Sequence, residues 1–153
     1  MALYLVQHGK SFPKEQDPSQ GLTPEGVADV KRIASVARGY GVRVARIEHS
    51  GKARAQQTAD LFAEALQPSR GVHERRGLNP LDDVSKVVRD LEVGEDLMLV
   101  GHLPFMERLT AFLVTGMPEG LILKFQNGGI VCLDQDRDNA RWFIRWTLMP
   151  KIG

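Results

Sequence analysis

The segment ALYLVQHG, residues 2–9, begins with five apolar residues and passes directly into Gln7, His8 and Gly9. A short continuous apolar run with branched and aromatic side chains, stopped soon afterwards by glycine, is typical of a strand buried on both faces of a sheet. We therefore predict a central strand over residues 2–6. This places His8 at the carboxyl end of the strand, where open parallel sheets bind their ligands.

The following hundred residues alternate between helix and strand patterns. Thr23 and Pro24 mark a helix start, with a capping hydroxyl before a proline at the first helical position. Spaced apolar residues and good helix formers predict helices over residues 24–39, 53–66, 81–91 and 104–114. Short apolar or alternating runs predict strands over residues 42–48, near residue 72 and over 96–101.

The last part of the chain has a different pattern. Residues 121–125, 130–133 and 142–148 look like strands joined by Gly- or Asp-rich turns, with no helix between them. These runs predict an antiparallel edge on a mostly parallel sheet whose two faces are covered by helices. The expected fold class is a three-layer α/β/α arrangement with an antiparallel C-terminal edge hairpin, in a single domain over residues 1–153.

Composition excludes several classes of function. Lys and Arg number 20 against 19 Asp and Glu, so the chain has no strong field to hold a nucleic acid or an anionic membrane. Cys132 is the only cysteine, which excludes an intramolecular disulfide and gives no sign of an oxidising compartment. The start of the chain lacks the pattern of a signal peptide, and its apolar runs are too short to span a bilayer. We expect a cytoplasmic protein without nucleic-acid or membrane partners.

Polar residues follow three of the predicted strands at the point where each strand ends. His8 follows the first strand, residues 50–54 follow the second, and His102 follows the strand over residues 96–101. Because the carboxyl ends of parallel strands meet at one edge of a sheet, we expect these side chains to lie close together. A single histidine at a strand end more often makes a local hydrogen bond than takes part in catalysis. The functional prediction therefore rests on the convergence of all three segments.

Four segments occur in an order that resembles a known family. They are QHG at 7–9, LTPEG at 22–26, SGKARAQQT at 50–58 and VGHLP at 100–104. The chain resembles the histidine phosphatase superfamily, which carries Arg-His-Gly after its first strand, then Ser-x-x-x-Arg-Ala-x-Gln-Thr and a late Gly-His. The short length, the form of the last segment and LNP at 78–80 resemble the SixA branch of phosphohistidine phosphatases.

The resemblance implies a phosphoglycerate mutase-like fold and a site in which His8, Arg54 and His102 are catalytic. A neutral imidazole is a good nucleophile at neutral pH and can carry a phosphoryl group, which suits His8. The planar guanidinium of Arg54 can hold two phosphate oxygens at once, and His102 would be a second phosphate ligand. The chemistry implied needs no cofactor, and the histidines show no spacing typical of metal ligands.

Further candidates adjoin these three residues in sequence. As substrate-binding residues we expect Gln7, Gly9, Lys10, Ser50 and Leu103. Lys52 is a weaker candidate of the same kind, because exposed lysines usually need no functional explanation. His49 and His73 match no catalytic position, and we expect them to be structural or solvated.

Gln7 departs from the family pattern, which has arginine before the nucleophile. The amide of glutamine can donate a hydrogen bond but carries no charge and cannot form a two-pronged contact with phosphate. If an electrostatic ligand in such a site contributes about 3 to 4 kcal/mol, its loss slows turnover by two to three orders of magnitude. A phosphate-recognising binding module with weak or no turnover is therefore one alternative to an enzyme.

Asn79 is a second departure. Many members of the superfamily place a carboxylate acid in this region, and asparagine cannot deliver a proton. The acid is dispensable when the leaving group is imidazole, whose conjugate acid has a pKa of about 6.5, whereas an alcohol needs more help. We therefore expect a phosphorylated protein histidine as substrate. The alternative is a small-molecule phosphomonoesterase, in which Glu74, Asp82 or Asp83 supplies the proton.

Overall fold

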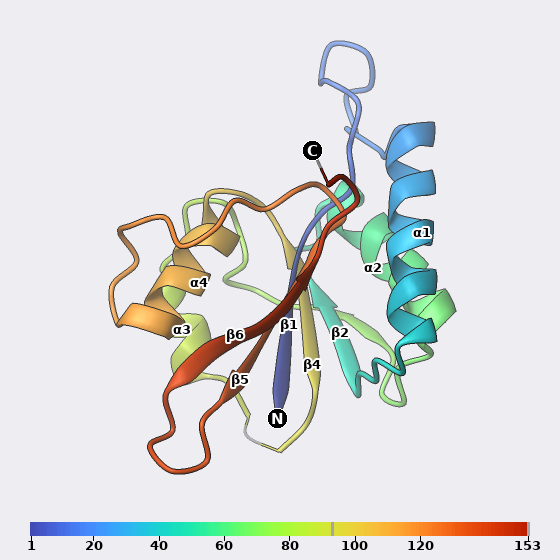
Figure 1. Cartoon of the computed structure of the whole chain (residues 1–153). Coiled ribbons are helices and arrows are strands. Elements are labelled where there is room, and N and C mark those ends of the chain that lie inside the picture. Colours follow the sequence, from blue (N-terminus) through green and yellow to red (C-terminus); the bar gives the residue numbers. More distant parts are fainter. Residues whose placement is uncertain (93, 153) are drawn as a thin grey trace.

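A computed structural model describes residues 1–92 and 94–152 of the chain. Strands and helices alternate through most of this length, as the sequence pattern predicts (Figure 1). In chain order the elements are β1 (Ala2–Gln7), α1 (Pro24–Gly39), β2 (Arg46–His49), α2 (Ala53–Leu66), β3 (Val72–Glu74), α3 (Val84–Arg89), β4 (Leu97–Gly101), α4 (Phe105–Thr115), β5 (Ile130–Gln135) and β6 (Trp142–Leu148).

The strands form one sheet in the order β3-β2-β4-β1-β5-β6. The first four of these strands run parallel, and β5 pairs antiparallel with both β1 and β6. The expected mostly parallel sheet with an antiparallel C-terminal edge is confirmed. Since β1, β2 and β4 are parallel, their carboxyl ends lie at the same edge, away from the N-terminus marked in Figure 1.

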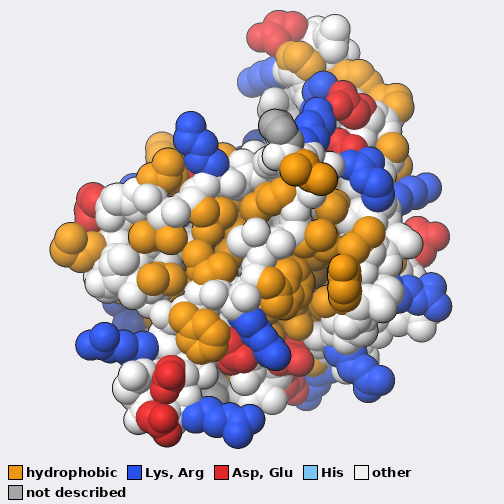
Figure 2. Space-filling view, in the orientation of Figure 1, with side chains coloured by type: hydrophobic (Ala, Val, Ile, Leu, Met, Phe, Trp, Pro, Cys, Tyr) orange, Lys and Arg blue, Asp and Glu red, His pale blue; other side chains and the backbone are white. Residues whose placement is uncertain are grey.

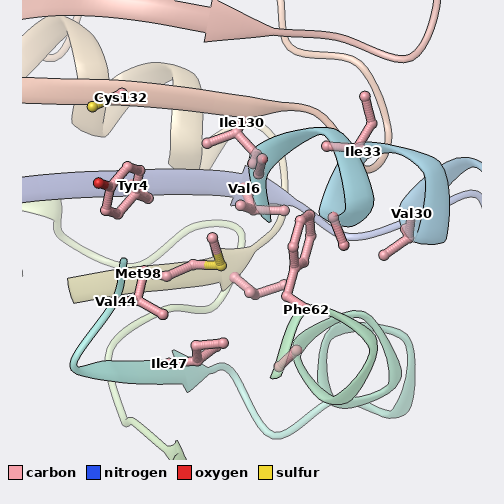
Figure 3. Close-up of a cluster of buried hydrophobic side chains, with 14 of the residues drawn as sticks. Tyr4, Val6, Val30, Ile33, Val44, Ile47, Phe62, Met98, Ile130 and Cys132 are labelled. Carbon is pink, nitrogen blue, oxygen red and sulfur yellow. The ribbon is translucent and has the colours of Figure 1, made fainter. Parts of the chain in front are cut away.

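Two apolar clusters lie on opposite faces of the sheet, and helices cover each. Tyr4 and Val6 of β1 belong to the cluster beneath α1 and α2, where Figure 3 shows Phe62 projecting from α2 toward Val6. Leu3 and Leu5 face the other way, into the cluster beneath α3 and α4. The continuous apolar run therefore reflects burial on both faces, which completes the three-layer architecture.

Helix α1 begins and ends as the sequence predicts. The Thr23 hydroxyl accepts from the Gly26 amide, and Pro24 occupies the first helical position. Beyond the helix, the Val42 amide still donates to the Ala37 carbonyl, which closes the last turn. Strand β2 therefore begins at Arg46, later than the expected residue 42.

The third helix and one predicted strand also differ from the sequence prediction. The third helix spans only Val84–Arg89, because the carboxylate of Asp83 accepts from the Ser85 amide and caps the helix there, while Leu81 is 82% exposed. The predicted strand over residues 121–125 is wrong. Its apolar residues are divided between core and solvent, with Phe125 buried and Leu121 58% exposed, and the segment pairs with no described strand.

The exposed segment between β1 and α1 forms a loop that stands beside α1 (Figure 1). The Phe12 amide donates to the Gly21 carbonyl, and the Asp17 carboxylate accepts from the amides of Ser19 and Gly21. β6 is the last strand of the sheet, and Figure 2 shows hydrophobic side chains gathered over the face where it lies. Within the described residues, no helix has the length and apolar character that a bilayer span requires.

Candidate active site

The end of β1 holds the side chain of His8 in a defined orientation. Its Nδ1 lies 2.7 Å from the carbonyl oxygen of Gly9, to which it donates its proton, so Nε2 keeps its lone pair. The backbone of His8 makes two hydrogen bonds, each 2.9 Å long. Its amide donates to the Gly101 carbonyl, and its carbonyl accepts from the side-chain amide of Asn127. The imidazole is therefore held in a fixed orientation with Nε2 unprotonated.

Thr58 joins the end of β1 to the first turn of α2. Its hydroxyl oxygen accepts from the amide of Gly9 at 2.9 Å and donates to the carbonyl of Arg54 at 2.8 Å. Thr58 is fully buried, so neither bond has water as a ready substitute. Because the Gly9 carbonyl orients His8, this one hydroxyl couples the position of the imidazole to that of Arg54.

His102 follows β4 and faces the end of β2. Its Nε2 lies 2.6 Å from the hydroxyl of Ser50, and its ring centre lies 5.1 Å from that of His8. His102 is only 2% exposed, whereas His8 and Ser50 are half-buried. The structure therefore brings together residues from three strand ends, as expected from the topology.

Two buried polar atoms at this edge have no hydrogen-bond partner among the described residues. They are Nδ1 of His102 and Oε1 of Gln7. Buried polar atoms are nearly always satisfied in folded proteins. These two atoms lack the partners that the described part of the chain would normally supply.

Arg54 lies in the first turn of α2 and is half-buried, and burial lowers its pKa. Its positive charge also lowers the pKa of both His8 and His102, so the guanidinium lies close enough to interact with each imidazole. Near a bound phosphate the same charge would be attractive. The arrangement favours an anion placed among the three side chains.

Burial is the main cause of low pKa values in both histidines. It lowers the pKa of His8 to about 4 and that of His102 to about 3, where His8, Arg54 and Lys52 add repulsion. Both rings are therefore neutral near neutral pH in the ligand-free protein. A neutral His8 has the free lone pair that a nucleophile needs.

These low values predict that the protein loses stability in acid. Between pH 6.5 and 4 the unfolded chain binds a proton on His8 that the folded protein does not bind, so the free energy of unfolding falls as the pH falls. Urea denaturation across this interval measures the decrease. The His8→Asn variant should show a shallower dependence, and an unchanged slope would contradict the assignment.

The remaining candidates lie at different distances from this centre. Gly9 is buried, with its amide and its carbonyl already bonded to Thr58 and His8. Leu103 packs against the cluster beneath α4. The ammonium of Lys10 is exposed and pairs with the carboxylate of Glu25 at 2.6 Å, which directs it toward the start of α1.

The three carboxylates considered as proton donors also have defined positions. Asp82 accepts from the Asn79 amide at 2.9 Å, and Asp83 caps α3. Only Glu74 reaches the loop that follows β2, where its carboxylate lies against Gly51. Asp82 and Asp83 therefore serve the local backbone, and Glu74 lies beside the site.

Sequence reasoning missed the roles of Asn127 and the Thr58 hydroxyl. Asn127 belongs to the turn before β5, and nothing in its local pattern indicates that its amide holds the carbonyl of His8. Thr58 was part of the quoted segment, but its contact with Gly9 spans 49 residues. The Asn127 contact depends on the sheet order, which places β5 beside β1, and the Thr58 contact depends on the packing of α2 near the end of β1.

The bond between Thr58 and Gly9 supports a prediction with a matched control. Thr58→Val keeps the shape but leaves the buried Gly9 amide unpaired, which should lower the free energy of unfolding by about 1–3 kcal/mol. Thr110→Val is the control, because the buried Thr110 hydroxyl donates only to the Met106 carbonyl of its own helix. Urea denaturation of both variants should show a larger loss for Thr58→Val. Equal losses would contradict the bridging role.

No protein-family model and no curated protein sequence matches the chain. Solved structures do match over nearly its whole length. The protein histidine phosphatase SixA complexed with tungstate is 23% identical, with a TM-score of 0.86 over 98% of this chain and 97% of the other. A protein from Agrobacterium tumefaciens assigned as phosphohistidine phosphatase SixA is 26% identical, with a TM-score of 0.78 over 98% of both chains.

Proteins with a different substrate also share the architecture. A protein from Escherichia coli assigned as an alpha-ribazole-5'-P phosphatase is 16% identical, with a TM-score of 0.77 over 100% of this chain and 99% of the other. At most of these sequence identities, structural similarity establishes a shared fold and does not by itself establish a shared substrate. The chain has the phosphoglycerate mutase-like fold of the histidine phosphatase superfamily, whose SixA members are among its structural neighbours.

Proposed function

We propose that this protein is a metal-independent phosphatase that removes the phosphoryl group from a phosphorylated protein histidine through a phospho-His8 intermediate. The observation that carries the proposal is the orientation of His8. Its Nδ1 is bonded to the Gly9 carbonyl, its Nε2 has no hydrogen-bond partner among the described residues, and its ring centre lies 5.1 Å from that of His102. The charge of Arg54 beside both rings suits a bound phosphate.

In the first step, the lone pair of His8 Nε2 attacks phosphorus, and the bond between phosphorus and the substrate imidazole breaks. The other ring nitrogen of the substrate imidazole takes a proton from water, and the electron pair of the broken bond stays on the nitrogen that leaves, so the leaving group is neutral imidazole. In the second step, water attacks the phosphorus of phospho-His8, phosphate departs and His8 is restored. Loss of a proton from the attacking water balances the proton taken up in the first step.

The neighbours of His8 have separate tasks in both steps. Arg54 holds two equatorial oxygens and offsets the charge that develops on them. When Nε2 of His102 donates to the Ser50 oxygen, which lies 2.6 Å away, the hydroxyl hydrogen of Ser50 is free to donate to a third oxygen. The side-chain amide of Gln7 is a further uncharged donor.

The class of substrate follows from the missing acid. Asn79 replaces a carboxylic acid in the family-like segment, and Asp82 and Asp83 are engaged by the local backbone. An imidazole leaves without strong acid catalysis, because its conjugate acid has a pKa of about 6.5, whereas an alkoxide does not. Phosphohistidine is therefore favoured over an alkyl phosphate, whose hydrolysis would require Glu74, the one of the three candidate carboxylates beside the site, to supply the proton.

The test compares three substrates at equal concentration: a histidine-phosphorylated carrier protein, phosphoserine and an aryl phosphate. We expect the carrier protein to release phosphate at least about 100-fold faster than phosphoserine, given the difference in leaving group. Equal rates would replace this proposal with a small-molecule phosphomonoesterase.

The uncharged Gln7 favours one second candidate, a binding module that captures a phosphorylated partner without turning it over. The variant Gln7→Arg separates the two. In the enzyme, wild type releases phosphate and Gln7→Arg releases it faster, by up to about 100-fold. A wild type that binds the phosphorylated carrier but releases nothing, beside an active Gln7→Arg, would establish the binding module.

A further inference from the structure

His49 is the last residue of β2 and is only 6% exposed. Its Nδ1 accepts a hydrogen bond from the amide of Gly51 at 3.0 Å. An amide nitrogen can only donate, so Nδ1 carries no proton and the proton of the neutral ring is on Nε2. His49 is therefore a buried acceptor that fixes the backbone two residues ahead of it.

The backbone that His49 fixes is the short loop over residues 50–52. Gly51 has φ +91°, which residues with a side chain rarely adopt, and a Cβ at this position would overlap the carboxylate of Glu74. Lys52 then caps α2 without a side-chain hydrogen bond. The loop thus depends on a glycine, is tightly packed and lacks a capping side chain, and the bond from the Gly51 amide to His49 holds its turn.

Both ends of this loop lead to the candidate active site. Ser50 places its hydroxyl 2.6 Å from Nε2 of His102, and the same oxygen accepts from the Lys52 amide at 3.4 Å. Two residues after Lys52, the first turn of α2 carries Arg54. A shift of the loop would therefore move the partner of His102 and the guanidinium together.

We propose that His49 is a positioning residue for the reaction, acting through the Gly51 amide to hold Ser50 against His102 and the start of α2 beside His8. This role rests on the proposed phosphatase function for its effect on rate, whereas the hydrogen bond itself can be tested without turnover. It assigns a function to a histidine that matches no catalytic position in the sequence.

The groups around His49 keep its ring in the accepting form. Asp60 of α2 and Glu74 of β3 are the charged groups that act on it, and both favour protonation. Burial acts in the opposite direction and is the larger effect, so the pKa of His49 is lowered. The ring stays neutral, and Nδ1 remains available to the Gly51 amide.

Three substitutions separate the hydrogen bond from the bulk of the ring. The Oδ1 atom of His49→Asn can take the place of Nδ1 as acceptor, whereas the longer side chain of His49→Gln places its amide nearer the position of Nε2. His49→Leu fills space without any acceptor. His73→Leu is the control, because His73 is an exposed histidine of the adjacent strand β3.

Two measurements are made on each variant: hydrogen exchange of the Gly51 amide by NMR, and kcat and KM for the phosphorylated carrier protein. His49→Asn and His73→Leu should keep slow Gly51 exchange and a kcat near wild type. His49→Gln and His49→Leu should exchange faster and lose on the order of tenfold in kcat with little change in KM, because a misplaced ligand acts on the transition state.

The proposal is overturned if His49→Asn behaves like His49→Leu in both measurements, since packing alone would then explain the loss. It is equally overturned if all three variants match wild type. If the wild type hydrolyses no substrate, the proposed function fails, and affinity for inorganic phosphate replaces kcat. A higher affinity in His49→Asn than in His49→Gln and His49→Leu then supports positioning, and equal affinities overturn it.

Discussion

The variant His8→Asn should release no measurable phosphate, with kcat lowered by more than about 10⁴-fold, because the residue that forms the covalent intermediate is absent. Asparagine is the informative replacement, since its side-chain amide can still donate to the Gly9 carbonyl in place of Nδ1. The loop after β1 therefore keeps its anchor, and only the nucleophilic nitrogen is lost. Initial rates with the histidine-phosphorylated carrier protein measure the effect.

A second measurement on the same variant separates chemistry from binding. His8→Asn should still bind inorganic phosphate, because Arg54 and His102 are unchanged, whereas it should acquire no radioactive label from the ³²P-phosphorylated carrier. Wild type quenched in alkali should carry the label, since a phosphorus–nitrogen bond to histidine survives base. Residual turnover in His8→Asn near the wild-type rate would show that water attacks the substrate directly and that no covalent intermediate forms.

Arg54→Lys should lower kcat by about 10²- to 10³-fold although the positive charge is retained. The guanidinium is planar and can hold two phosphate oxygens with two parallel hydrogen bonds, whereas an ammonium is a point charge on a flexible stem. Arg54 also lies in the first turn of α2, where the backbone is fixed through Thr58. The ammonium of lysine cannot form the two parallel hydrogen bonds that a fixed, planar guanidinium makes with phosphate.

The control for this prediction is Arg38→Lys, a change of the same chemistry at an exposed position in the last turn of α1. It should leave both kinetic parameters unchanged. Steady-state rates with the phosphorylated carrier give kcat and KM separately, and the loss in Arg54→Lys should fall mainly on kcat. A loss below about threefold would mean that charge alone is sufficient and that the two-pronged contact is not used.

The parts of the fold that sequence predicted well are those set by local chemistry. The apolar run of β1 gives its strand, and the hydroxyl of Thr23 followed by Pro24 gives the start of α1. The meeting of His8 with His102 follows from topology, because parallel neighbouring strands end at one edge. For these elements, local preference and the final structure agree.

The errors arose where burial decides the outcome. Residues 121–125 are as apolar as a strand, yet only Phe125 reaches the core, and the segment has no strand to pair with among the described residues. Likewise the contact of Asn127 with His8 joins segments 119 residues apart. Such contacts depend on which strands become neighbours, and local patterns carry no information on that choice.

The central position of β1 has a kinetic consequence. Leu3 is in register with Leu97 of β4 on one side and with Leu133 of β5 on the other, so both partners of the first strand are distant in sequence. Forming such pairs requires closing large loops, and the chain loses conformational entropy before the strand contacts can offset that loss. Folding is therefore slow. During synthesis, the strand that leads to His8 remains unpaired until most of the chain has left the ribosome. Its apolar residues are exposed during that interval, and unpaired apolar strands of this kind are prone to aggregation.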